Sequence, residues 1–158
     1  MARSAIALLG LLLAGCAGPR PPEELSGLWS AGPAACAAGV GVRFRAEAIE
    51  AVYDDEVETL FSQPQYEIEE RTERAFRVRI VYHLPRLGSG AGTVGAHGVL
   101  ILARQEDGGI AAVAHTLVDG LTGAARVRIV NDPASSLLAL EPCGAHPWRE
   151  DLRGRVPA

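Results

Sequence analysis

Apolar and polar residues alternate with a period of two along most of the chain from residue 26 onward. The clearest case is the segment 75–84, in which one face carries five apolar residues: Phe76, Val78, Ile80, Tyr82 and Leu84. Such alternation is typical of a half-buried β-strand. Together with this segment, the pattern predicts about nine strands, the others lying near 25–29, 40–45, 49–53, 57–62, 93–103, 110–118, 125–129 and 136–141.

Turn signals separate these segments. Charged or glycine-rich turns are expected at 54–56, 70–74, 106–109 and 119–123, and loops at 31–39 and 85–92. Gln63 and Pro64 are expected to break the strand at 57–62 before alternation resumes at 66–68. Because no amphipathic helix of twelve or more residues lies between the strands, the pattern favours an all-β antiparallel meander. Closure into a single β-barrel of eight or nine strands removes its exposed edges.

The segment after Cys143 departs from the period of two. Pro147 is a suitable first residue for a helix, and Trp148 and Leu152 lie four residues apart, on one face of such a helix. We therefore expect a short C-terminal helix that packs on the outside of the barrel or caps one end.

The first sixteen residues indicate export. Arg3 is the only charged residue before an apolar run of about ten residues at 5–14, which suits a signal peptide and is shorter than the ~20 residues of a membrane-spanning helix. The run ends in Leu13-Ala14-Gly15-Cys16, which resembles the lipobox of bacterial lipoproteins. That resemblance implies lipidation at Cys16. Two alternatives are an ordinary secretory signal cleaved near Ala17 and a buried core helix.

The predicted organisation therefore has three parts: a signal peptide at 1–15, a lipidated Cys16 with a proline-rich linker at 16–25, and one β-domain at 26–158. By resemblance to lipoproteins, Ala17 after the lipidated cysteine points to the outer membrane, with the domain facing the periplasm. The protein is therefore expected to associate with the membrane through its N-terminal lipid. All 15 basic residues are arginines, against 19 acidic residues. This balance opposes nucleic-acid binding.

Cys36 and Cys143 remain once Cys16 is assigned to lipid. An oxidising compartment and two spare thiols favour one disulfide between them. Two buried free thiols are the alternative.

The layout of the domain resembles that of the lipocalins: a Gly-x-Trp motif at 27–29, a run of antiparallel strands and a short C-terminal helix. The resemblance implies that a late arginine, Arg149 or Arg153, lies over Trp29. Small periplasmic inhibitors of proteases and lysozyme also use compact, disulfide-bonded β-barrels.

Catalytic and metal-binding motifs are absent from the sequence. The run 90–95 matches the Gly-x-Gly-x-x-Gly dinucleotide fingerprint, but a strand-like segment follows it where the fingerprint needs a helix. We read the glycines as a hairpin loop and, at Gly98, as a strand position that needs close backbone packing. His83, His97 and His115 fall on three consecutive strands and would bind a metal only if register placed them together. We expect no catalytic residue, no cofactor and no metal site.

Arginines alternate along the polar faces of three strands: Arg43, Arg45, Arg77, Arg79, Arg126 and Arg128. Cross-strand pairing with Glu50, Glu67 and Glu69 is the favoured interpretation. The alternative is recognition of an anionic partner such as lipid headgroups or a cell-wall polymer.

The functional expectation is a non-catalytic protein that binds an apolar small molecule or lipid. Aromatic residues make up only 5% of the chain, and small inward side chains leave room in a barrel. The expected ligand-binding residues are Phe44, Phe76, Ile80 and Tyr82. The alternative is a protein-binding module, such as an inhibitor of a periplasmic hydrolase or a scaffold, with a periplasmic protein partner.

Overall fold

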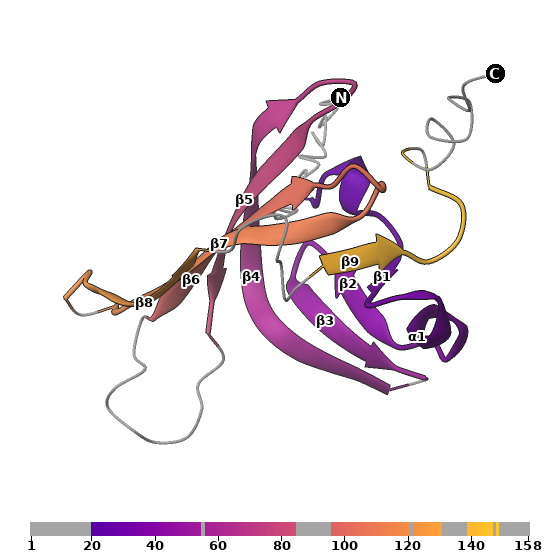
Figure 1. Ribbon diagram of the computed structural model, residues 1–158. Coiled ribbons are helices and arrows are strands. Elements are labelled where there is room, and N and C mark those ends of the chain that lie inside the picture. The colour runs from indigo at the N-terminus through magenta and orange to yellow at the C-terminus, as the bar shows by residue number, and fades with distance from the viewer. Residues whose placement is uncertain are drawn as a thin grey trace, which may run out of the picture.

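The computed structural model describes residues 20–54, 56–84, 96–120, 122–130, 139–146 and 148, and these form an all-β fold (Figure 1). A 3-10 turn, η1 (Glu23–Leu25), and a five-residue helix, α1 (Pro33–Ala37), are its helical elements. The strands are β1 (Leu28–Ser30), β2 (Gly41–Phe44), β3 (Ala48–Tyr53), β4 (Glu56–Arg71), β5 (Phe76–His83), β6 (His97–Arg104), β7 (Ile110–Val118), β8 (Ala125–Val130) and β9 (Ala139–Pro142).

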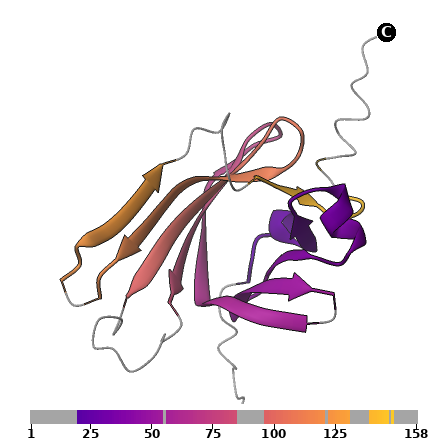
Figure 2. The same cartoon turned by 60° about the horizontal axis from the view of Figure 1, so that its bottom comes forward.

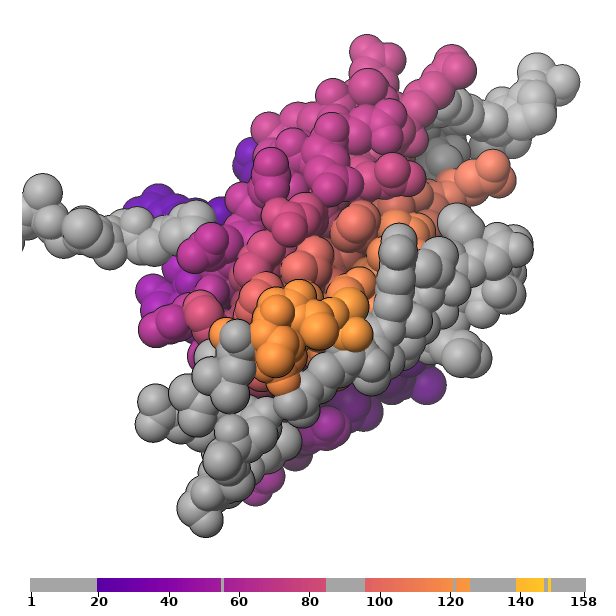
Figure 3. Space-filling model, turned by 90° about the vertical axis from the view of Figure 1, so that its left-hand side faces the viewer, coloured from indigo at the N-terminus to yellow at the C-terminus, as the bar shows by residue number. Residues whose placement is uncertain are grey.

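Eight of the strands close into an antiparallel barrel, which confirms the predicted fold class. The ring runs β6-β5-β4-β3-β2-β1-β9-β7, and β7 pairs with β6 to complete it. The remaining strand, β8, pairs with β7 and lies outside the ring. Figure 2 shows β5, β6, β7 and β8 fanning out on one side of the molecule, with β1, β2, β3 and β9 on the other. Figure 3 shows the surfaces of β4, β5, β6 and β7 next to one another on the face turned toward the viewer.

Strand β7 pairs with two different strands, β9 and β8, along one of its edges. Its first two residues pair with β9 (Ile110 with Leu140, Ala111 with Ala139), and its segment 114–118 pairs with β8. On its other side, β9 pairs with β1 over only two positions, Trp29 with Pro142 and Ser30 with Glu141. The barrel is therefore closed by a short strand with few ladder positions.

Two local predictions were wrong. The segments 57–62 and 66–68 belong to one strand, β4, of sixteen residues. Gln63 takes a positive φ of 50°, and the ladder is irregular between Ser62 and Gln65. A bulge accommodates Pro64 because the missing N–H then costs no ladder hydrogen bond.

The second correction concerns the loop expected at 31–39, which contains α1. Pro33 at its first turn presets a helical φ, and the alanines that follow are strong helix formers. The predicted C-terminal helix lies outside the described residues apart from Trp148. Among the residues described, no helix is long and apolar enough to cross a membrane.

The barrel incorporates part of the predicted linker. Pro22 and Leu25 are buried, and Leu25 accepts a hydrogen bond of 3.3 Å at its carbonyl from Trp29 Nε1. Arg71 on β4 forms a 2.8 Å ion pair with Glu24. The packed domain therefore extends back to Pro22.

One end of the barrel holds the main core. Its buried members come from segments along the whole domain: Leu25, Trp29, Phe44, Ile49, Phe76, Val78, Ile80, Leu102, Ile110, Ala112 and Trp148. The predicted disulfide is present: Cys36 on α1 is bonded to Cys143, which directly follows β9. The N–H of Cys143 also donates to the carbonyl of Leu28, at 2.8 Å. These contacts fasten the closing strand to β1.

Candidate functional site

The four residues expected to bind a ligand lie in two different environments. Phe44, Phe76 and Ile80 belong to the packed core, where Phe76 lies 5.3 Å from the Trp148 ring. Side chains fill this end, so these three residues hold the barrel together. Tyr82 is also buried but lies outside that cluster, toward the other end of β5.

Tyr82 reaches across a neighbouring strand to meet His115. The two residues lie on β5 and β7, with β6 between them, and the β6 residue directly opposite Tyr82 is Gly98. A Cβ at Gly98 would overlap the Tyr82 ring, so only glycine leaves the space that the tyrosine crosses. The Tyr82 hydroxyl then lies 2.5 Å from His115 Nε2. Close backbone packing is the expectation for this strand, and at Gly98 the close neighbour is the Tyr82 side chain.

Desolvation keeps both partners of the bridge uncharged near neutral pH. Burial raises the pKa of Tyr82 to about 12 and lowers the pKa of His115 from its ordinary value of 6.5. The hydrogen bond therefore joins two neutral groups, and the histidine tautomer sets which of them donates. Phe61 of the neighbouring strand β4 stacks on the Tyr82 ring, with 3.9 Å between ring centroids.

The inner wall around this bridge keeps some solvent exposure. Register places Leu100 opposite Ile80 and His115, and Leu117 opposite Gly98, so both leucines share the inward face with Tyr82. Leu100, His115, Leu117 and Phe61 are all half-buried. Phe61 and Leu100 also pack against the main core, so the group adjoins the core on one side and keeps some contact with solvent on the other. We call the group formed by Phe61, Tyr82, Leu100, His115 and Leu117 the open-end cluster.

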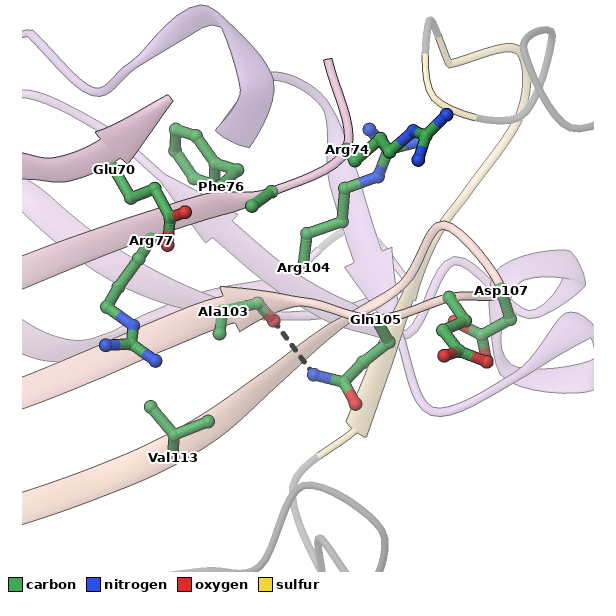
Figure 4. A pocket seen from close by; sticks show the side chains of 11 residues that line it. Glu70, Arg74, Phe76, Arg77, Ala103, Arg104, Gln105, Asp107 and Val113 are labelled. Carbon is green, nitrogen blue, oxygen red and sulfur yellow. Dashed lines mark hydrogen bonds between the residues drawn. The ribbon is translucent and has the colours of Figure 1, made fainter. Parts of the chain in front are cut away.

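A concavity of about 660 Å³ lies between the β4–β5 and β6–β7 hairpins (Figure 4). Three arginines and three carboxylates line it: Arg74, Arg77, Arg104, Glu70, Glu106 and Asp107. Several of the side chains that line the concavity already form hydrogen bonds within the protein. Arg104 donates to the Glu73 carbonyl at 2.9 Å, and Asp107 accepts from the Gly109 N–H at 2.9 Å. Gln105 folds back onto the Ala103 carbonyl. Its balanced charge gives this pocket no preference for one sign of ligand.

The histidines of the three consecutive strands do not converge. His83 and His97 are opposite each other on the outward face of β5 and β6, whereas His115 lies on the inward face with Tyr82. Within the described part of the chain, no group of three or more His, Cys, Asp or Glu side chains is placed to hold a metal ion.

The arginine pattern is partly explained by cross-strand pairing, as the sequence favoured. Arg79 lies 3.2 Å from Glu67, and Arg45 lies 3.8 Å from Glu50. Arg43 and Arg77 form no ion pair within the described residues. The side chains of Arg126 and Arg128 lie outside the described set.

An arginine does lie over a tryptophan, although neither residue is one that the lipocalin resemblance implied. The guanidinium of Arg104 is 4.9 Å from the ring of Trp148. Trp148 in turn lies edge-on to Trp29, with 6.1 Å between ring centroids. Arg149 and Arg153 fall outside the described residues.

Sequence reasoning missed most of the open-end cluster. Phe61, Leu100 and Leu117 are ordinary strand residues, and His115 was singled out only as a metal candidate. The one available signal was Gly98, a glycine inside a strand pattern. Comparisons of the chain with family models, curated proteins and solved structures found no match. Function is therefore inferred from the site alone.

Proposed function

We propose that this protein is a non-catalytic, lipid-anchored protein of the bacterial envelope that binds an apolar small molecule or lipid at the open-end cluster. The observation that carries the proposal is the half-buried state of inward-facing Phe61, Leu100 and Leu117. Each half-exposed apolar side chain gains free energy when a ligand removes it from water, at about 25 cal/mol per Å².

The chemistry of the cluster suits binding. Ligand sites in proteins are mostly apolar, with a few polar groups that fix orientation. Here the walls are aliphatic and aromatic, and the Tyr82–His115 bridge supplies the polar element. Both members are uncharged near neutral pH, so an apolar guest meets no buried charge.

The anchor part of the proposal comes from the sequence alone. Leu13-Ala14-Gly15-Cys16 follows an apolar run of signal-peptide length, so Cys16 is the expected lipid carrier and the outer membrane, facing the periplasm, the expected location. A protein tethered in this way meets membrane lipids at high local concentration.

Ligand binding is tested with the secreted Cys16→Ser form by native mass spectrometry and by titration with a fluorescent fatty acid. Leu117→Glu places a charge on the inward face and should weaken binding at least tenfold. Thr116→Glu is the matched control, since Thr116 is half-buried on the opposite face of the same strand. It should bind as the parent does.

Two outcomes would refute the ligand proposal. One is the absence of binding at high micromolar fatty acid together with recovery of one stoichiometric protein partner, which would favour the protein-binding module. The other is equal loss of binding in Leu117→Glu and Thr116→Glu.

The anchor is tested separately. Replacement of Cys16 by Ser should release the protein from the membrane fraction or leave it as an unprocessed precursor. Mature Cys16→Ser protein that still fractionates with membranes after a high-salt wash, which removes electrostatic association, would contradict lipidation.

A further inference from the structure

We propose that a hollow lined by Arg20, Arg43 and Arg45 docks the domain on an anionic phospholipid headgroup of the membrane that carries the anchor. The hollow has a volume of about 420 Å³ and is completed by Ser26, Phe44 and Glu47. This inference rests on the anchoring part of the proposed function. The residues that line the hollow do not belong to the open-end cluster.

The first argument is the reach of the chain. Arg20 is four residues after Cys16, and four extended residues span at most about 14 Å. Arg20 itself lines the hollow. If the acyl chains on Cys16 enter the bilayer, the mouth of the hollow is held close to the headgroup layer. The anchor therefore presents this face to the lipid surface.

The second argument is the local charge. Three arginines and one glutamate line the hollow, whereas the whole chain carries a formal net charge of −4. A positive region in an acidic protein points to a specific anionic partner, since the rest of the surface repels anions. Anionic lipids attract arginines within about a Debye length of the surface, 8–10 Å at ordinary salt.

The third argument is the availability of the guanidinium groups. Arg20 and Arg43 form no ion pair within the described residues, and Arg43 extends from the outward face of β2. Arg45 approaches Glu50 only to 3.8 Å, and its side chain is 53% exposed. These arginines can therefore donate to phosphate oxygens without breaking a tight pair.

The backbone under the hollow is held in place. The Arg45 N–H donates to the Ala48 carbonyl at 2.9 Å, and the Tyr66 hydroxyl donates to the Arg45 carbonyl at 2.8 Å. Phe44, the last residue of β2, precedes Arg45 and is buried in the core. The position of Arg45 is thus fixed by the barrel, and docking would orient the whole domain on the bilayer.

The test measures association of the secreted Cys16→Ser chain with vesicles by co-sedimentation. Neutral phosphatidylcholine vesicles are compared with vesicles that contain 30% phosphatidylglycerol, roughly a physiological anionic fraction. Each arginine near an anionic surface contributes about a fivefold gain in binding. Arg43→Gln/Arg45→Gln should therefore lower the affinity for anionic vesicles by roughly twentyfold, and added salt should lower the parent's affinity.

Arg77→Gln/Arg79→Gln is the matched control, because it removes the same charge from β5, outside the hollow. It should retain the parent's affinity. Equal binding to both vesicle types, or an equal loss in the two double variants, would overturn the proposal. Saturable binding of inorganic phosphate without a preference for anionic vesicles would overturn the headgroup assignment.

This experiment separates the two proposals. If Cys16 proves unmodified, the natural protein replaces the Cys16→Ser form and the vesicle comparison still decides whether the hollow binds anionic lipid. If Cys16 is lipidated but both vesicle types bind equally, the anchor stands and the docking site does not.

Discussion

Removal of the Cys36–Cys143 disulfide should destabilise the folded domain by up to ~5 kcal/mol. The two cysteines are 107 residues apart in sequence. In the chain-entropy model the stabilisation grows with the logarithm of the loop length, and a loop of this size gives about 5 kcal/mol at 25 °C. Since domains of this size are stable by about 5–15 kcal/mol, the loss is a large share of the total.

The structure also predicts which strand pairing opens first when the disulfide is removed. The disulfide joins α1 to the residue after β9, and β9 has two register positions with β1 and two with β7. The rest of the barrel is joined by longer ladders, such as the seven positions between β5 and β6. Without the disulfide, the β1–β9–β7 junction should open before the ladders of β4, β5 and β6.

The measurement is equilibrium urea unfolding of Cys36→Ala/Cys143→Ala in the Cys16→Ser background, compared with the oxidised parent. The midpoint should fall by an amount equivalent to several kcal/mol. Amide hydrogen exchange should accelerate most at β9 and β1. If the double variant does not fold, reduction of the parent in stepwise urea gives the same comparison.

Two results would refute this reasoning. A change below about 1 kcal/mol would show that the short junction is held by packing and that the loop entropy is offset in the native state. Uniform acceleration of exchange across all strands would show that the disulfide does not protect the β9 junction in particular. Two alkylatable thiols in the native protein, purified under oxidising conditions, would show that the Cys36–Cys143 disulfide does not form.

Four further outcomes follow from the packed residues. Gly98→Ala should cost about 1–3 kcal/mol, measured by urea unfolding, because the new Cβ displaces the Tyr82 ring. Tyr82→Phe should cost about 1–3 kcal/mol, since it leaves the half-buried His115 Nε2 without its hydrogen-bond partner. Because the pKa of His115 is lowered below 6.5 in the folded state, the unfolded chain binds the extra proton, so stability should fall as the pH drops below about 6.5. This pH dependence should weaken in His115→Gln. Trp148→Ala should cost about 3–5 kcal/mol, well above Arg104→Ala, because the tryptophan belongs to the core and the arginine only covers it.

The period-two pattern was sufficient to predict the barrel because each strand buries one face. Phe76, Val78, Ile80 and Tyr82 are all nearly inaccessible to solvent in the structure, as their alternation required. The break expected at Pro64 failed for a local reason. A bulge with Gln63 at positive φ absorbs the proline, and whether a strand contains a bulge depends on its neighbours rather than on its own residues.

The open-end cluster was not predictable in the same way because it depends on register across three strands. Gly98 must stand opposite Tyr82, and His115 must lie on the inward face of β7. A shift of one residue in either ladder would turn His115 outward. The same sensitivity separates His115 from His83 and His97, which lie one strand position away from the inward face.

The distribution of aromatic residues separates the four expected ligand residues into two environments. A low share of aromatic residues predicts room throughout the barrel. The structure instead gathers Trp29, Phe44, Phe76 and Trp148 at one end, beside the disulfide-linked junction. That concentration leaves leucines, a glycine, Phe61 and a single Tyr–His bridge to line the other end. The filled end supplies the packing free energy, so the open end can keep apolar side chains partly exposed. A binding site in this fold is therefore expected where the large side chains are scarce, and Tyr82 is the one predicted residue that lies there.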